Sequence, residues 1–183
     1  MRYPVIRSMA LAGLLICSMA SVSLAQASDP DDSRSQWWTA WTCEVTPVRA
    51  GPVPETISGV PDDVFWLQAT PTSDTTIELI VWLWTGNRPL PVNGIYEQEE
   101  MFTKWLWAFS EPMSEIAVDV TSDTGVAGEV QFGGMITGSS TGPVNGWPSY
   151  AVVPEPGCYT FTITATAQSG AVFQGEIVFP AVP

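Results

Sequence analysis

The carboxyl-terminal part of the chain has the clearest alternation of apolar and polar residues. Every second position from 159 to 165 is apolar, and threonine occupies the positions between them. A period of two is typical of a β-strand with one buried face. Two prolines and a glycine at 154–157 favour a turn before it. A second β-rich run at 171–179 follows a short polar connection, so the pattern predicts an antiparallel hairpin.

Upstream of this hairpin, short runs rich in β-branched and aromatic residues alternate with connections rich in proline, glycine and serine. Six of these runs have the composition of strands: 37–46, 64–70, 77–84, 102–109, 114–121 and 150–153. A weaker candidate lies at 129–132, and no segment has a convincing helical period. About eight strands without a helix predict an all-β protein in which two antiparallel sheets pack face to face, because each sheet has one apolar side to bury.

The amino terminus has the pattern of an export signal. Arg2 and Arg7 precede an uncharged run at 8–24. Ala25 and Ala27 then place small residues at both positions that a signal peptidase reads. The apolar run is short and contains several serines, so it is poorly suited to span the hydrocarbon core of a bilayer.

This pattern divides the chain into three parts. We expect residues 1–27 to be a cleaved signal peptide, 28–36 to be a flexible acidic leader, and 37–183 to form the β-sandwich domain. The protein is then secreted, and is extracellular or associated with the cell envelope, with no transmembrane span in the mature chain. Cys17 follows a lipobox-like leucine, but Ile16 stands where a lipoprotein needs a small residue.

The charge of the chain excludes one class of partner. The 183 residues carry six basic and nineteen acidic side chains, a net charge of −13. Removal of 1–27 leaves four basic against nineteen acidic residues, a net charge of −15. Nucleic acids are excluded as partners because phosphate binding needs a cationic surface. The same field repels anionic lipid headgroups, and the ordinary interpretation of such acidity is solubility.

Two cysteines remain after cleavage, Cys43 and Cys158. An exported chain enters an oxidising compartment, so we expect these two residues to form one disulfide. The alternation gives one observation against the bond. Cys158 belongs to the threonine face of its strand, whereas Cys43 shares a side with apolar neighbours, although the first residue of a strand can deviate from the ideal pleat.

The sequence around the second cysteine carries a resemblance. From Trp147 to Thr162 it reads WPSYAVVPEPGCYTFT. This stretch resembles a group of secreted bacterial immunoglobulin-like β-sandwich proteins of unknown function, which share Pro-Ser and then Pro-x-x-Gly-Cys-(Trp or Tyr) at the start of a late strand. The resemblance covers roughly residues 102–180 and includes the KWLW motif at 104–107. It implies an immunoglobulin-like antiparallel β-sandwich of about eight strands in an exported protein, and it implies no activity.

Candidate catalytic chemistry is sparse. The chain has no histidine, which excludes Ser-His-Asp and Cys-His sites and the usual zinc ligand sets. Hydrolysis by paired carboxylates at Glu97, Glu99 and Glu100 is an alternative, but acids beside a loop are usually a solvated face. The loop aspartates do not have EF-hand spacing. We therefore expect no catalytic residue, no metal and no cofactor.

The nine tryptophans give the best functional signal. Trp82 and Trp84 project to one side of a strand, as do Trp105 and Trp107. Burial in the core is the ordinary interpretation, and we favour it for Trp105 and Trp107. The strand of Trp82 and Trp84 already has an aliphatic face to bury, so this pair is free to stack on a sugar ring or fill a pocket of a protein partner. Trp147, at the end of a glycine- and serine-rich loop, is a third candidate.

These observations favour a secreted, non-catalytic binding module with an unknown extracellular ligand, either a glycan or a protein. The sequence also allows two alternatives. One is a glycan-active enzyme that uses carboxylates, and the other is a purely structural envelope domain.

Overall fold

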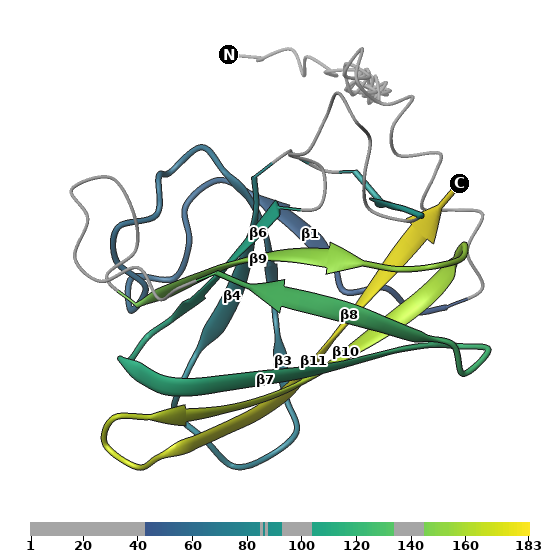
Figure 1. The fold of residues 1–183 in the computed structure, drawn as a ribbon. Helices are drawn as coiled ribbons and strands as arrows, with labels where there is room; N and C mark the ends of the chain where they lie inside the picture. The colour runs from purple at the N-terminus through teal and green to yellow at the C-terminus, as the bar shows by residue number, and fades with distance from the viewer. Residues whose placement is uncertain (1–42, 85, 87, 93–103, 134–144) are drawn as a thin grey trace, which may run out of the picture.

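The described part of the chain is all-β. A computed structural model describes the following residues: 43–84, 86, 88–92, 104–133 and 145–183. These residues form eleven strands and contain no helix (Figure 1). The predicted all-β class is therefore confirmed. The predicted signal peptide and acidic leader lie outside the described residues, and no described segment is an apolar helix long enough to cross a membrane.

The strands pair in one continuous order. They are β1 (Val48–Ala50), β2 (Phe65–Gln68), β3 (Thr70–Pro71), β4 (Leu79–Leu83), β5 (Leu90–Pro91), β6 (Lys104–Phe109), β7 (Met113–Ser122), β8 (Ala127–Phe132), β9 (Gly146–Val152), β10 (Gly157–Ala167) and β11 (Val172–Val182). The order across the sheet is β1-β2-β4-β6-β9-β8-β7-β10-β11-β3, and β5 pairs with β11. All named strand pairs are antiparallel except β5 with β11.

The strand β8 joins the two halves of this sheet. Its first residues pair with β7, where Gly128 lies opposite Val120, and its last residues pair with β9, where Phe132 lies opposite Ser149. The sheet therefore curls over on itself, with β2, β4, β6 and β9 in one half and β7, β10 and β11 in the other (Figure 1). The two predicted sheets are therefore joined into one, because β8 pairs with β7 at its start and with β9 at its end.

The core lies between the two halves. The ring of Trp105 on β6 lies 5.0 Å from Phe161 on β10 and 5.4 Å from Phe179 on β11, measured between ring centroids. Trp107 is also fully buried, and its Nε1 donates a 2.7 Å hydrogen bond to Oγ of Ser149, itself a buried side chain. Trp105 and Trp107 are therefore core residues, and the buried indole N–H of Trp107 has its acceptor in Ser149.

We call the surface of β2, β4 and β6 that faces away from this core the outer face. A second, smaller apolar cluster covers one end of it. Ile57 and Val64, from the connection between β1 and β2, pack there with Trp66, Ile80 and Ala108 of the three strands. The outer face is therefore covered at the Ile80 end by Ile57 and Val64, neither of which belongs to a strand.

The predicted disulfide is present between Cys43 and Cys158. It joins residues 115 positions apart, with 6.3 Å between their Cα atoms. Cys43 lies before β1 and outside any strand, so the alternation of neighbouring residues does not fix the side to which it points. The segment after Cys43 is held by Thr46, whose N–H donates to the Val178 carbonyl while its Oγ1 accepts from the Val178 N–H, both at 2.8 Å.

The turn before β10 is held by a tyrosine side chain. The hydroxyl of the fully buried Tyr159 donates a 3.0 Å hydrogen bond to the carbonyl of Glu155, four residues earlier. Burial raises the pKa of the Tyr159 phenol above its usual value of 10.0, and the negative charges of Glu155 and Asp123 raise it further. The N–H of Asp123 donates to the Cys158 carbonyl at 2.8 Å, which ties the β7–β8 turn to the same place.

Candidate binding surface

Trp82 and Trp84 lie together on the outer face, as the alternation predicts. Trp82 belongs to β4, and Trp84 is the first residue after Leu83, where that strand ends. Their rings stack with centroids 4.7 Å apart and planes 7° from parallel. Trp82 is partly buried and Trp84 is 40% exposed. Tryptophan is highly buried on average, so the exposure of Trp84 is above what is usual for this residue type.

The exposure of Trp84 follows from its position along β4. Ile80 belongs to the smaller apolar cluster and is fully buried, Trp82 is partly buried and packs against that cluster, and Trp84 is not part of it. Successive outer-face residues of β4 therefore go from covered to open. Because a β-strand rises about 3.3 Å per residue, a step of two residues is enough to leave the covering segment.

Two further side chains complete the surface next to Trp84. The N–H of Trp84 donates a 3.4 Å hydrogen bond to the carbonyl of Lys104 on β6, and the Lys104 Nζ lies 4.6 Å from the centroid of the Trp84 ring. Tyr150 of β9 lies directly opposite Lys104 and is 43% exposed. We call Trp82, Trp84, Lys104 and Tyr150 the aromatic patch. Sequence reasoning missed Lys104 and Tyr150, since only the pairing of β4, β6 and β9 brings them to the tryptophans.

The structure does not bring Trp147 to this patch. Trp147 lies opposite Trp107 in the register of β6 and β9, and it packs against the inner core beside Phe132. Its side chain therefore lies on the other face of the sheet from Trp84. The Trp147 Nε1 is buried, and it has no hydrogen-bond partner within the part of the chain that the structure describes. Most of the loop that precedes it lies outside the described residues.

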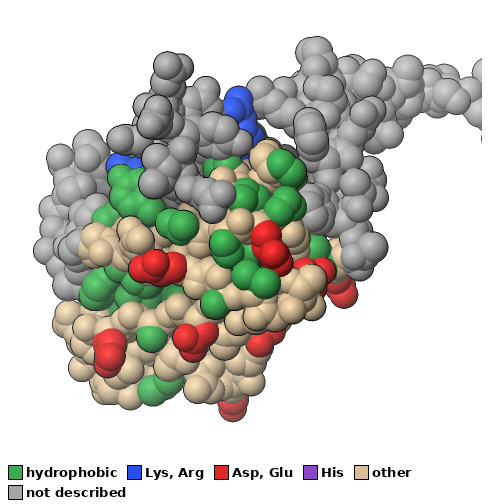
Figure 2. Space-filling view, turned by 45° about the vertical axis from the view of Figure 1, so that its right-hand side comes forward, with side chains coloured by type: hydrophobic (Ala, Val, Ile, Leu, Met, Phe, Trp, Pro, Cys, Tyr) green, Lys and Arg blue, Asp and Glu red, His purple; other side chains and the backbone are tan. Residues whose placement is uncertain are grey.

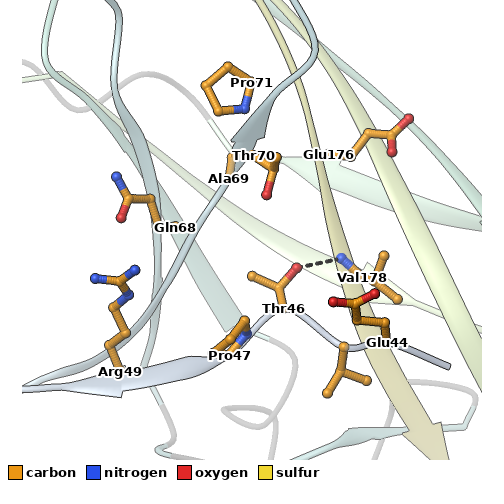
Figure 3. Close-up of a pocket in the computed structure, with 11 residues that line it drawn as sticks. Glu44, Thr46, Pro47, Arg49, Gln68, Ala69, Thr70, Pro71, Glu176 and Val178 are labelled. Carbon is orange, nitrogen blue, oxygen red and sulfur yellow. Dashed lines mark hydrogen bonds between the residues drawn. The ribbon is translucent and has the colours of Figure 1, made fainter.

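A polar groove lies elsewhere, where the segment before β1 passes over β11 and the end of β2. Its volume is about 620 Å³, and it shares no residue with the aromatic patch. Figure 3 shows Arg49 and Gln68 on one side and Glu44 and Glu176 on the other. The Arg49 guanidinium also lies 5.2 Å from the centroid of the Trp66 ring. The groove offers charges of both signs to a small polar ligand, but it offers no large exposed ring.

The carboxylates in the described part of the chain form no assembled metal site. Within the ranges described above, no three His, Cys, Asp or Glu side chains are grouped so that they could hold an ion. The candidate acids Glu97, Glu99 and Glu100 lie outside the described residues.

Acidic side chains are scattered over the surface. In Figure 2 they are spread across the lower part of the face shown, whereas the few basic side chains lie at its upper edge. Lys104 is the only lysine of the whole sequence. The aromatic patch therefore combines exposed rings with one of the few cations of a strongly acidic chain. Comparison of the sequence with models of protein families and with curated proteins finds no match.

Proposed function

We propose that this chain is an exported, non-catalytic β-sandwich domain that binds an extracellular ligand at the aromatic patch. The single observation that carries the proposal is the open end of the tryptophan stack, with Trp84 40% exposed next to a fully formed core. Exposing so large an apolar ring forgoes favourable burial, and rigid aromatic side chains are the usual anchors of binding surfaces.

The arrangement around Trp84 favours binding because it restricts the ring before a ligand arrives. Trp82 is itself partly buried and packs against Trp84 on one face. The Lys104 ammonium lies over the same ring, a cation–π contact of about 0.5–1 kcal/mol at an exposed site. A pre-ordered ring loses little conformational entropy on binding, so more of the contact energy contributes to affinity.

Export and the immunoglobulin-like architecture belong to the same proposal. The cleavable leader predicted at 1–27 and the Cys43–Cys158 bond support an oxidising, extracellular location. The order β7-β10-β11 places β10 in the middle, and the Tyr159–Glu155 hydrogen bond closes its start. A tyrosine corner at the start of a central strand is a hallmark of immunoglobulin sandwiches, so we interpret the curled sheet as a variant of that fold.

The proposal is tested with the exported, processed protein on arrays of glycans and of extracellular proteins. We expect specific binding that the Trp84→Ala variant loses. Val172→Ala is the matched control, because Val172 is 45% exposed on β11, outside the aromatic patch. Silence on both arrays, or binding that Trp84→Ala leaves intact, would contradict the proposal and favour a structural role.

A further inference from the structure

The aromatic patch continues as a row of side chains that crosses four strands. Trp84 follows β4, Lys104 lies beside it on β6, Tyr150 lies opposite Lys104 on β9, and Gln131 lies opposite Tyr150 on β8. Adjacent strands are about 4.8 Å apart, so Trp84 and Tyr150 are separated by roughly 10 Å across the sheet. A ligand lying along the row meets an aromatic ring, an ammonium, a second ring and an amide in turn.

This alternation matches the chemistry of a sugar chain. A pyranose ring has a face of C–H groups that packs on an aromatic side chain, and hydroxyl groups around its rim. The Tyr150 hydroxyl and the Gln131 amide each offer a donor and an acceptor to such hydroxyls, and Lys104 offers donors. The separation of Trp84 and Tyr150 exceeds the width of one ring, so the row fits a chain of sugars better than a single one.

The small exposed aromatic area favours a narrow ligand over a protein partner. An aromatic side chain carries about 150–250 Å² of surface, so Trp84 and Tyr150 together expose roughly 200 Å². A stable protein–protein interface covers about 800 Å² on each partner around an apolar centre. The two rings offer a fraction of that area, which is enough to stack sugar residues.

The charge of the chain selects among glycans. The net charge is −13, and the described cations are Arg49, Arg88 and Lys104, of which only Lys104 belongs to the row. A polyanion such as a uronic-acid or sulfated polymer needs several cations along its path to offset this field. An uncharged polysaccharide is not repelled.

We infer that the aromatic patch binds an uncharged glycan chain that lies across β4, β6, β9 and β8. One sugar ring stacks on Tyr150, and another takes the place of the Lys104 ammonium over the Trp84 ring, so that Lys104 becomes free to donate to a sugar hydroxyl. This inference rests on the proposed function and specifies its ligand class. Gln131 and Lys104 are then positioned to contact the hydroxyl groups between and beyond the two stacked rings.

The test uses soluble uncharged polysaccharides, namely galactomannan, arabinoxylan and hydroxyethylcellulose, with alginate and heparin as anionic counterparts. Retardation in affinity gels identifies a binder, and calorimetry with its oligosaccharides gives Kd. We expect Trp84→Ala and Tyr150→Ala to weaken binding about tenfold or more, since truncating an aromatic anchor costs at least 1.4 kcal/mol. Trp84→Phe, which keeps a ring, retains most of the affinity, and Val172→Ala leaves Kd unchanged.

Salt gives an independent readout. The Kd for an uncharged glycan stays within about twofold when NaCl rises from low to high concentration, because no counterions are released. Circular dichroism of each variant confirms that it is folded.

Each outcome decides the inference. Binding restricted to alginate or heparin, or binding of an extracellular protein through Trp84, overturns the glycan inference and leaves the proposed function intact. Glycan binding that neither Trp84→Ala nor Tyr150→Ala reduces overturns both. Absence of binding to every polysaccharide tested also overturns the inference.

Discussion

Removing the Cys43–Cys158 bond tests how the amino-terminal segment contributes to stability. The perturbation is the double variant Cys43→Ser/Cys158→Ser, compared with the oxidised protein. The bond closes a loop of 115 residues. In the chain-entropy model such a loop restricts the unfolded ensemble by about 5 kcal/mol at 25 °C. This is a large share of the roughly 5–15 kcal/mol by which domains are usually stable.

We expect this loss of stability to arise from the unfolded state, because the folded segment has other contacts that hold it. In the folded protein the segment is also held by the two hydrogen bonds between Thr46 and Val178, so it stays in place without the disulfide. We therefore expect the double variant to keep the native near-ultraviolet spectrum below its unfolding transition. The more expanded unfolded chain also exposes more surface, so the slope of the free energy against urea increases.

Urea unfolding followed by tryptophan fluorescence measures the effect. The oxidised protein, the same protein under reductant, and the double variant are compared at one pH. The reduced protein and the double variant should coincide, about 5 kcal/mol below the oxidised form. Thr46→Val is the matched control, because it removes one acceptor of the segment, costs about 1 kcal/mol and leaves the disulfide intact. A loss below about 2 kcal/mol in the double variant would refute the entropic reasoning.

Three further predictions concern the core. Ser149→Ala leaves the buried indole N–H of Trp107 without its acceptor, so urea titration should show a loss of about 1–3 kcal/mol, and an unchanged midpoint would contradict it. Burial raises the folded-state pKa of Tyr159, so above pH 10 the unfolded chain loses its phenolic proton while the folded protein keeps it. The free energy that Tyr159 contributes to stability is complete below pH 10 and declines as the pH rises toward the folded-state pKa. The difference in unfolding free energy between the wild type and Tyr159→Phe should therefore shrink above pH 10 in urea titrations at several pH values. A difference that stays constant with pH would contradict this prediction. Gly175→Ala places a Cβ 2.6 Å from a carbon of the buried aromatic ring two residues earlier, so calorimetry should show a lower Tm and a cost of about 1–3 kcal/mol, and an equal Tm would show that the ring yields freely.

Local patterns in the sequence determined the all-β class and most of the strands. The alternation at 159–165 corresponds to the inner face of β10, and the two apolar runs at 77–84 and 102–109 contain β4 and β6. The position of Trp82 and Trp84 on one side of a strand was also predicted, because residues two apart in a strand share a face. Period, composition and turn chemistry are properties of neighbouring residues, so they can be read from a single sequence.

The strand predicted at 37–46 is wrong in the part that the structure describes. Its described residues, 43–46, form no strand, and β1 lies instead at 48–50, between two of the predicted strands. Such short edge strands depend on a partner strand more than on their own composition.

Only the tertiary structure decided which aromatic side chains are open. Ile57 covers one end of the outer face and leaves Trp84 at the other, and the register of β6 with β9 places Lys104 and Tyr150 beside it. The same register turns Trp147 toward the core. Exposure is set by what packs on a face, and register is set by contacts between distant segments, so neither can be read from the residues adjacent to Trp84.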